Sequence, residues 1–176
     1  MDKSIEKRAR KVTTIGDLVV ITDECILIID NGFNQTIINK SCFKIDTHTG
    51  IFYNVGGALD SMSCSNLELV NSAYTLVTLP TCKVIFRINQ ALLDQDPHQT
   101  EALIQPHQAR AFGVMIDDCA RCHVAANGKP GGQCIGIGED TLSLHFDGWK
   151  YYLRIRLPTI EKISSLFIYK LTLPNP

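Results

Sequence analysis

Residues 141–158 read TLSLHFDGWKYYLRIRLP, and this segment decides the fold class that we predict for the chain. It consists of two runs in which apolar and polar residues alternate, joined by Asp147-Gly148. Alternation with a period of two is typical of strands buried on one face, and Asp-Gly suits a tight hairpin turn because both residues tolerate a positive φ. We therefore predict a β-hairpin. Its apolar face would carry Leu142, Leu144, Phe146, Trp149, Tyr151, Leu153, Ile155 and Leu157.

The opposite face of the second strand is basic and aromatic, since it carries Lys150, Tyr152, Arg154 and Arg156. Tyrosine and tryptophan rings stack on the apolar faces of sugars, and arginine donates hydrogen bonds to their hydroxyls. Tyr152, Arg154 and Arg156 are therefore our candidate ligand-binding residues. Trp149 is a further candidate, although the alternation favours the apolar face for it.

Length, composition and charge restrict the class of protein. The chain has 176 residues, of which 45% are hydrophobic and 20% are charged, and its formal net charge is −1. This length favours a single domain, 1–176, in which residues 1–11 form a charged lead segment. The near-neutral charge predicts neither nucleic acid nor an anionic membrane surface as a partner. Because no run of about 18 apolar residues occurs, we expect no membrane span, and the polar first residues predict no signal peptide.

Short β-prone runs follow one another along the chain, separated by turns such as Asp30-Asn31-Gly32. Residues 58–73 fit a short helix or a long loop equally well, and residues 101–104 fit one helical turn. The other predicted strands are residues 18–29, 36–38, 42–45, 51–55, 74–79, 83–89, 111–116 and 164–173, and Asp23-Glu24 could be a turn that divides the first of them into two short strands. This pattern predicts an all-β fold, an antiparallel β-sandwich of jelly-roll type with at most one or two short helices.

One cysteine motif suggests a cofactor. The run Cys119-Ala120-Arg121-Cys122-His123 matches the CxxCH signature of covalent haem attachment. Its context argues against haem, because no methionine follows it to serve as a second axial ligand. A zinc site that adds Cys134 is one alternative, and loop thiols without a metal are the other. The seven cysteines leave at least one unpaired and do not decide the redox compartment.

Three segments in the second half of the chain resemble the galactose-binding-like jelly-roll modules that are appended to polysaccharide-degrading enzymes. Residues 146–151, FDGWKY, are similar to the F-x-G-W-x-Y strand pair of those modules. Residues 111–118 resemble the strand before it, and residues 163–174 resemble the last strand. Order and spacing agree over residues 83–174. Met115 and Asp117 depart from the pattern, which has an aromatic residue and glycine at these positions.

This resemblance implies a non-catalytic module that binds carbohydrate or a similar polar ligand, beside an enzyme domain or as the free partner of an enzyme. It implies a site at the edge or on the concave face of the sandwich, where Asp117 and Asp118 are further candidates. A structural calcium ion is common in that family, so the resemblance also implies calcium. A carbohydrate-binding function would place the protein outside the cell or at its surface.

The first half of the chain supports a different hypothesis, because it resembles the opening of proteasome-like N-terminal-nucleophile hydrolases. The similar segments are residues 19–23, 43–46 and 55–60. That resemblance implies Thr13 or Thr14 as a nucleophile freed at the N-terminus, Asp23 as the acid, and Lys40 or Lys44 as the base. A structural or protein-interaction sandwich without a small ligand is the third hypothesis. Of the three, we expect a binding module rather than an enzyme.

Overall fold

The computed structural model of the chain describes residues 12–15, 18–21, 25–32, 34–55, 64–96, 98–118, 132–148 and 150–172. Strands predominate in these ranges, and two short helices accompany them. In chain order the elements are β1 Val12–Ile15, β2 Leu18–Ile21, β3 Cys25–Ile29, β4 Ile37–Asn39, β5 Lys44–Val55, β6 Cys64–Thr78, β7 Lys83–Ile88, β8 Ala91–Asp94, β9 Glu101–Ile104, α1 Pro106–Ala111, β10 Ile116–Asp117, β11 Cys134–Ile137, β12 Asp140–Ser143, β13 His145–Phe146, β14 Tyr151–Arg156, α2 Ile160–Ser165 and β15 Ile168–Lys170. The predicted all-β class is therefore confirmed.

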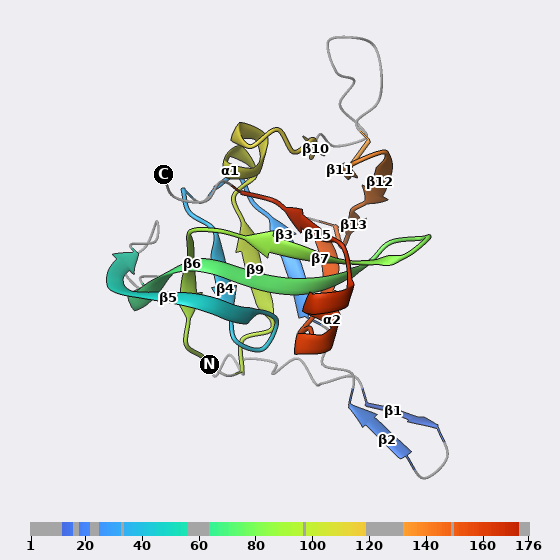
Figure 1. The fold of residues 1–176 in the computed structure, drawn as a ribbon, viewed down its shortest axis with the longest axis horizontal. Coiled ribbons are helices and arrows are strands. Elements are labelled where there is room, and N and C mark those ends of the chain that lie inside the picture. The colour runs from blue at the N-terminus through green and yellow to red at the C-terminus, as the bar shows by residue number, and fades with distance from the viewer. Residues whose placement is uncertain are drawn as a thin grey trace, which may run out of the picture.

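Ten of the strands form one mixed sheet, the body of the molecule in Figure 1. The strand order is β13-β14-β3-β9-β4-β8-β6-β7-β15, and β5 pairs with β6. Because β14 also pairs with β6, through Ile155↔Val77 and Arg156↔Leu76, the six strands from β14 to β6 close into a ring. Closure removes the open edges between these strands. The β1–β2 hairpin and the β10-β11-β12 sheet are separate ladders.

The pairing within the ten-stranded sheet differs from the entirely antiparallel arrangement that we expected. Three pairs are parallel: β3 with β9, β4 with β8, and β7 with β15. The first two pair strands that are distant in the sequence, because β9 lies between β3 and β4, and β8 lies between β4 and β6. Local alternation shows which segments are strands, but it does not show which strands are neighbours.

Several strands are apolar on both faces because both faces are buried in the structure. In β7, Val84, Ile85 and Phe86 are each 2% exposed or less, so Ile85 is buried although it alternates with Val84 and Phe86 along the strand. β3 has the same character, since four of its five residues are buried. Continuous apolar runs of this kind are typical of strands that are covered on both sides.

The alternation that we predicted for the second strand of the 141–158 hairpin is confirmed in β14. Leu153 and Ile155 are 2% and 1% exposed, whereas Arg154 and Arg156 are exposed. The hairpin itself is shorter than predicted, because β13 pairs through only two residues while β12 pairs with β11. Phe146 was predicted to be buried but is 52% exposed and stacks on the ring of Tyr151, with a centroid distance of 4.8 Å.

Leu157, also predicted on the apolar face, is 48% exposed, because β14 ends one residue earlier and its alternation stops there. The helix or loop predicted over residues 58–73 is wrong from residue 64 onward, where β6 begins. The helical turn predicted at residues 101–104 is the strand β9, and α1 follows it. The last predicted strand, residues 164–173, is wrong in its first half, where α2 ends.

Both helices begin with strong local signals. Pro106 lies in the first turn of α1, where its missing N–H is tolerated, and the Thr159 side chain accepts a hydrogen bond from Lys162 N at the start of α2. Neither is long and apolar enough to cross a membrane, and the described ranges contain no other helix.

Candidate active site

A carboxylate is presented at the end of the central strand β3. Asp30 follows Ile29 directly and opens the turn Asp30-Asn31-Gly32. Gly32 N donates a hydrogen bond to Asp30 Oδ1 at 2.7 Å, and Asp30 N donates to the Ile104 carbonyl at 3.2 Å. Asp30 is half-buried, while Asn31 and Gly32 are exposed. The core strand therefore fixes the position of one carboxylate in an accessible turn.

The far end of the same loop is attached to α1. Thr36 is fully buried, and its hydroxyl accepts a hydrogen bond from Gln105 N at 3.2 Å. The same hydroxyl donates to Gln108 Oε1 at 2.6 Å. Gln108 N in turn donates to Gln105 Oε1, which caps the first turn of α1. Thr36 thus holds the loop that begins at Asp30 against the start of the helix.

The Asp30 turn is also held from the other end of α1. Arg110 Nη2 donates to Asp118 Oδ1 at 2.6 Å and to the Ile116 carbonyl at 3.0 Å. Asn31 Nδ2 donates to the second oxygen of Asp118 at 2.6 Å. Asp118, which we predicted to bind a ligand, therefore connects the turn to Arg110. Asp117 faces a different partner, because its carboxylate accepts from Gly132 N.

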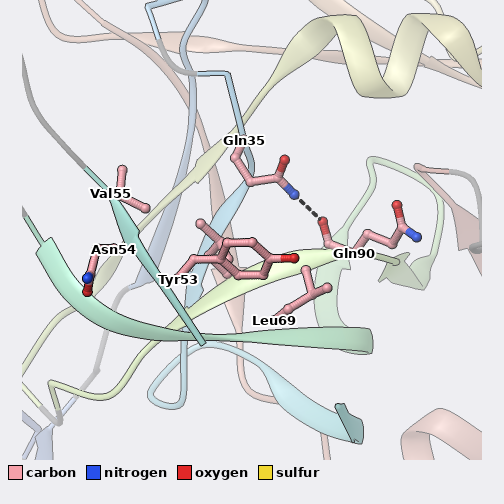
Figure 2. Close-up of a pocket in the computed structure, with 7 residues that line it drawn as sticks. Gln35, Tyr53, Asn54, Val55, Leu69 and Gln90 are labelled. Carbon is pink, nitrogen blue, oxygen red and sulfur yellow. Dashed lines mark hydrogen bonds between the residues drawn. The ribbon is translucent and has the colours of Figure 1, made fainter. Parts of the chain in front are cut away.

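A cavity of about 570 Å³ lies between this loop and the β5–β6 hairpin, and Figure 2 shows its walls. The loop supplies Gln35, five residues after Asp30, whose side-chain amide donates to the Gln90 carbonyl at 2.8 Å. The hairpin supplies an exposed tyrosine, Tyr53, and a leucine, Leu69. The complete lining is Gln35, Tyr53, Asn54, Val55, Leu69, Gln90 and Leu92. It combines amide groups with apolar side chains.

The β5–β6 hairpin carries its own polar anchor. The Glu68 side chain is 8% exposed and accepts hydrogen bonds from Gly50 N at 3.2 Å and from the His48 ring, whose Nδ1 lies 2.9 Å from Oε2. The pairing register shifts at this point, and Gly50 adopts a φ of 71°. The hydrogen bond from His48 and the Gly50 N–H lower the pKa of Glu68 below 4.5, against the opposing effect of burial. Glu68 thus stabilises the bulge between the sheet and the outer part of the hairpin.

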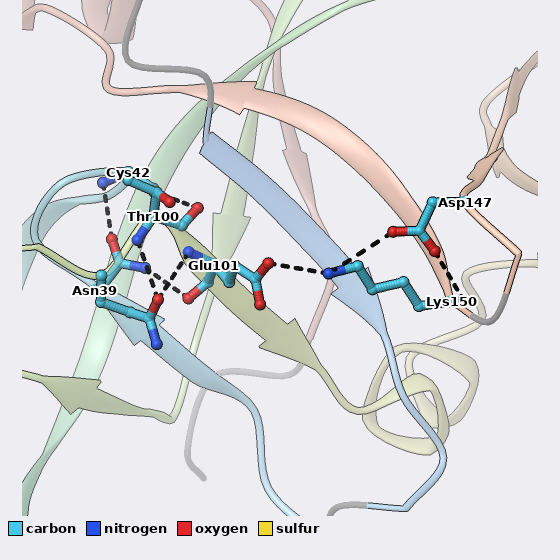
Figure 3. A network of polar contacts seen from close by, with 7 residues as sticks. Asn39, Cys42, Thr100, Glu101, Asp147 and Lys150 are labelled. Atoms are coloured by element: carbon cyan, nitrogen blue, oxygen red, sulfur yellow. Dashed lines mark hydrogen bonds and ion pairs between the residues drawn. The ribbon is translucent and has the colours of Figure 1, made fainter. Parts of the chain in front are cut away.

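A second polar network joins β9 to the turn before β14, as Figure 3 shows. Lys150 Nζ lies 2.9 Å from Glu101 Oε1 and 3.9 Å from Asp147 Oδ2. Asn39 Nδ2 donates to the Glu101 carbonyl at 2.8 Å, and Cys42 N donates to Asn39 Oδ1 at 3.0 Å. We predicted Lys150 on the exposed basic face, but its side chain is only 15% exposed. Its role here is to connect strands.

The structure places three of the predicted ligand residues on one surface. Arg154 and Arg156 line a second cavity of about 240 Å³, and Tyr152 stacks on His145, another residue of its wall, at a centroid distance of 5.4 Å. Asp117 and Asp118 belong to the separate Asp30 region. Trp149 lies outside the described residues.

Several other predicted residues lie outside the described ranges. They include the motif from Cys119 to His123 and the proposed acid Asp23. Thr13 and Thr14 lie in β1, and Lys40 Nζ donates a hydrogen bond to Gln95 Oε1. Neither observation tests the threonine-hydrolase hypothesis, which stays a prediction. Among the described residues, no group of three or more His, Cys, Asp or Glu side chains is placed to hold a metal ion.

Sequence reasoning identified Asp30 only as part of a turn. The available signal was the apolar run CILII immediately before Asp-x-Gly, which places a carboxylate at the end of a core strand. Comparisons with protein families, curated proteins and solved structures found no match to this chain. Both resemblances therefore remain predictions.

Proposed function

We propose that this chain is one subunit of a homodimeric aspartic peptidase, in which Asp30 faces Asp30 of a second copy. The observation that carries the proposal is the Asp30 turn: a half-buried carboxylate at the end of a core strand, oriented by Gly32 N at 2.7 Å. The loop around it is held by the fully buried Thr36 and by Asp118. Catalytic groups need such positioning, because small displacements of the reacting atoms reduce rates strongly.

The chemistry requires two carboxylates that share one proton. The ionised member removes a proton from a water molecule as its oxygen bonds to the peptide carbonyl carbon, and the protonated member donates a hydrogen bond to the carbonyl oxygen. The C–N bond of the tetrahedral intermediate then breaks as a carboxyl group of the dyad passes its proton to the leaving amine. Asp118 lies beside the turn but is bonded to Arg110 and Asn31, so it is not placed to share a proton with Asp30. A two-fold axis beside the exposed turn would supply the second Asp30, and two-fold dimers are the commonest protein assemblies.

The cavity and the hairpin fit an extended peptide. Gln35 and Gln90 offer amide groups to a peptide backbone, while Leu69 and Leu92 offer apolar contact to its side chains. The β5–β6 hairpin forms one wall of the cavity and carries exposed apolar residues beyond its bulge, including Phe52 at 51% exposure. Hairpin flaps that close over a substrate and exclude water are an established device of peptidases.

The direct test is cleavage of a fluorogenic peptide library by the purified full chain across acidic and neutral pH. We expect a bell-shaped dependence of rate on pH, because the productive dyad holds one proton. Asp30→Asn should abolish cleavage while leaving the circular dichroism spectrum unchanged. Asp140→Asn, which makes the same change at an exposed residue, should retain full activity. Equal activity in the Asp30→Asn variant would exclude Asp30 as the catalytic group.

A second candidate function is the binding of carbohydrate or a similar polar ligand. It is supported by the cavity that Arg154 and Arg156 line, beside the stacked rings of Tyr152 and His145. Aromatic rings and guanidinium groups are a suitable combination for sugars. A glycan array and calorimetric titrations test it, and we expect weak binding that Tyr152→Ala reduces. Flat responses to both neutral and acidic polysaccharides would rule out this function.

A further inference from the structure

Positive charge is concentrated in one part of the ten-stranded sheet. Residues 69–93, 148–160 and 162–176 contain none of the 18 acidic residues of the chain but seven of its 17 lysine and arginine residues. These segments supply β7, β14, β15 and most of β6, which pair in the order β14-β6-β7-β15. The net charge of −1, from which we predicted no nucleic-acid partner, is therefore an average over a basic part and an acidic part of the chain.

Four residues form a row across the strands of this part of the sheet. Lys44 of β5 pairs with Tyr74 of β6, and Tyr74 pairs with Arg87 of β7. Arg87 pairs in turn with Lys170 of β15. Paired residues on adjacent strands project from the same face of a sheet, and adjacent strands lie about 4.8 Å apart. Three cations and one aromatic ring thus form a basic row about 14 Å long on one face.

The lysines at the two ends of the basic row are available to a ligand. Lys44 and Lys170 are exposed, and neither side chain has a hydrogen-bond or ion-pair partner among the described residues. The acidic residue nearest to the row along β5 is Asp46, whose carboxylate accepts a hydrogen bond from the hydroxyl of the buried Ser72 at 2.8 Å. An anion bound along the row would therefore meet two lysines that are not engaged in ion pairs.

The middle of the basic row presents two flat groups. The guanidinium carbon of Arg87 lies 5.7 Å from the centroid of the Tyr74 ring, and both side chains are half-buried. Arg87 Nε donates to Asn89 Oδ1 at 3.0 Å, while its two Nη groups make no hydrogen bond within the described part of the chain. Nucleic-acid bases stack on tyrosine rings and on guanidinium planes, whereas an acidic peptide or a lipid head group gains no stacking from them.

We propose that the basic row binds single-stranded nucleic acid. The phosphate groups would lie against Lys44, Arg87 and Lys170, and a base would stack on Tyr74. These contacts recognise the backbone and the flat faces of the bases, so we expect little sequence preference. The basic row shares no residue with the Asp30 site or with the cavity assigned to carbohydrate, so this binding function is independent of both.

The experiment is a fluorescence-anisotropy titration of the full chain with a labelled oligouridylate of about 15 nucleotides, repeated at several salt concentrations. Three phosphate contacts predict a slope of log Kobs against log salt concentration of about −2, because each contact with a single strand contributes about −0.7. Lys170→Gln should weaken binding and change the slope to about −1.4. Lys40→Gln removes the same charge from an exposed lysine outside the row and should leave affinity and slope unchanged.

A second variant tests the stacking contact separately from the charge. Tyr74→Leu should weaken oligouridylate binding at least about fivefold and leave the slope unchanged, because stacking releases no counterions. Circular dichroism checks that this variant is folded. Unchanged affinity in a folded Tyr74→Leu chain would show that no base stacks on the row and would overturn the proposal.

Competition distinguishes nucleic acid from other anionic partners. If polyglutamate of the same length displaced oligouridylate as well as unlabelled oligouridylate does, the row would bind acidic peptides, and equal displacement by phosphatidylserine vesicles would indicate a membrane surface. Either result would overturn the proposal, as would the absence of binding. Equal losses of affinity in Lys170→Gln and Lys40→Gln would reveal a general charge effect and would also overturn it. The Asp30→Asn chain should bind oligouridylate as tightly as the unaltered chain.

Discussion

Gly32 N lies 2.7 Å from Asp30 Oδ1, so the backbone of the turn itself orients the carboxylate that ends β3. A side chain at residue 32 would crowd this contact, because a Cβ placed there would lie 3.1 Å from the same oxygen. The position of Asp30 is therefore set by the local geometry of Asp-x-Gly as well as by the sheet.

We predict that Gly32→Ala displaces the Asp30 carboxylate. Peptide cleavage should fall at least about tenfold, while the free energy of unfolding should fall by only about 1 kcal/mol, since the turn is exposed. Gly136→Ala is the control for a tight contact made away from Asp30, because a Cβ there would lie 3.0 Å from Met115 Cε and 3.2 Å from Met115 Cβ. Urea unfolding and cleavage rates measure both effects. Unchanged cleavage in Gly32→Ala would show that the turn does not position the catalytic group.

The buried hydroxyl of Thr36 should contribute measurably to stability. Thr36→Val keeps the shape of the side chain but leaves Gln105 N without its acceptor. A buried donor left unsatisfied costs about 1–3 kcal/mol, and we expect a loss of this size in urea unfolding. Thr141→Val, at an exposed position, should change the unfolding free energy by less than about 0.5 kcal/mol. Equal effects of the two substitutions would contradict the proposed attachment of the loop to α1.

Glu68 should make the stability of the hairpin depend on pH. Its pKa is lowered in the folded state, chiefly by the hydrogen bond from His48, so its contribution is complete above its ordinary value of 4.5 and is lost as the pH falls through the folded pKa. We expect Glu68→Gln to lose less stability than the unaltered chain between about pH 6 and about pH 3. Glu139→Gln, at an exposed position, serves as the control. If the free energies of unfolding of Glu68→Gln and the unaltered chain fell equally with pH, Glu68 would not stabilise the bulge.

The disulfide between Cys25 and Cys42 joins the start of β3 to the segment before β5, across a sequence separation of 17 residues. Cross-linking a loop of this length restricts the unfolded chain, and we expect Cys25→Ala/Cys42→Ala to lower the free energy of unfolding by about 3 kcal/mol. Reduction by dithiothreitol should lower the stability of the unaltered chain and leave the variant unaffected. A chain that is insensitive to reductant would contradict the bond.

Two described cysteines should differ in reactivity. Burial raises the pKa of the Cys134 thiol, and the negative charge of Asp117 raises it further, whereas Cys82 is exposed. Because the thiolate is the reactive form, we expect iodoacetamide near neutral pH to label Cys134 at least about tenfold more slowly than Cys82. Site-resolved mass spectrometry measures the two rates. Faster labelling of Cys134 would show that β11 is not packed as described.

The sequence correctly predicted features of the fold that depend on residues close together in the chain. It missed features that depend on contacts between segments far apart in the chain. Alternation predicted the buried Leu153 and the exposed Arg154 correctly, because burial on a strand has a period of two. Alternation does not predict that β9 lies between β3 and β4, because that pairing joins segments far apart in the chain.

The candidate site was missed for a similar reason. Threonine is mostly exposed in proteins, so nothing local marks Thr36 as fully buried. The contacts of Asp118 with Arg110 and Asn31 also need the folded chain, since Asn31 lies 87 residues from Asp118. Asp118 was selected as a ligand-binding candidate, and the structure places it in contact with Asn31, next to Asp30 in the chain.

The proposed peptidase needs two copies of Asp30 acting together, and mixed dimers test this requirement most directly. Unaltered and Asp30→Asn chains are unfolded together, refolded in varying proportions, and assayed for peptide cleavage at constant total protein. If each active dimer needs both carboxylates, activity follows the square of the unaltered fraction, so an equal mixture retains about one quarter of full activity. Retention of about one half would show that each chain acts alone and would contradict the shared dyad.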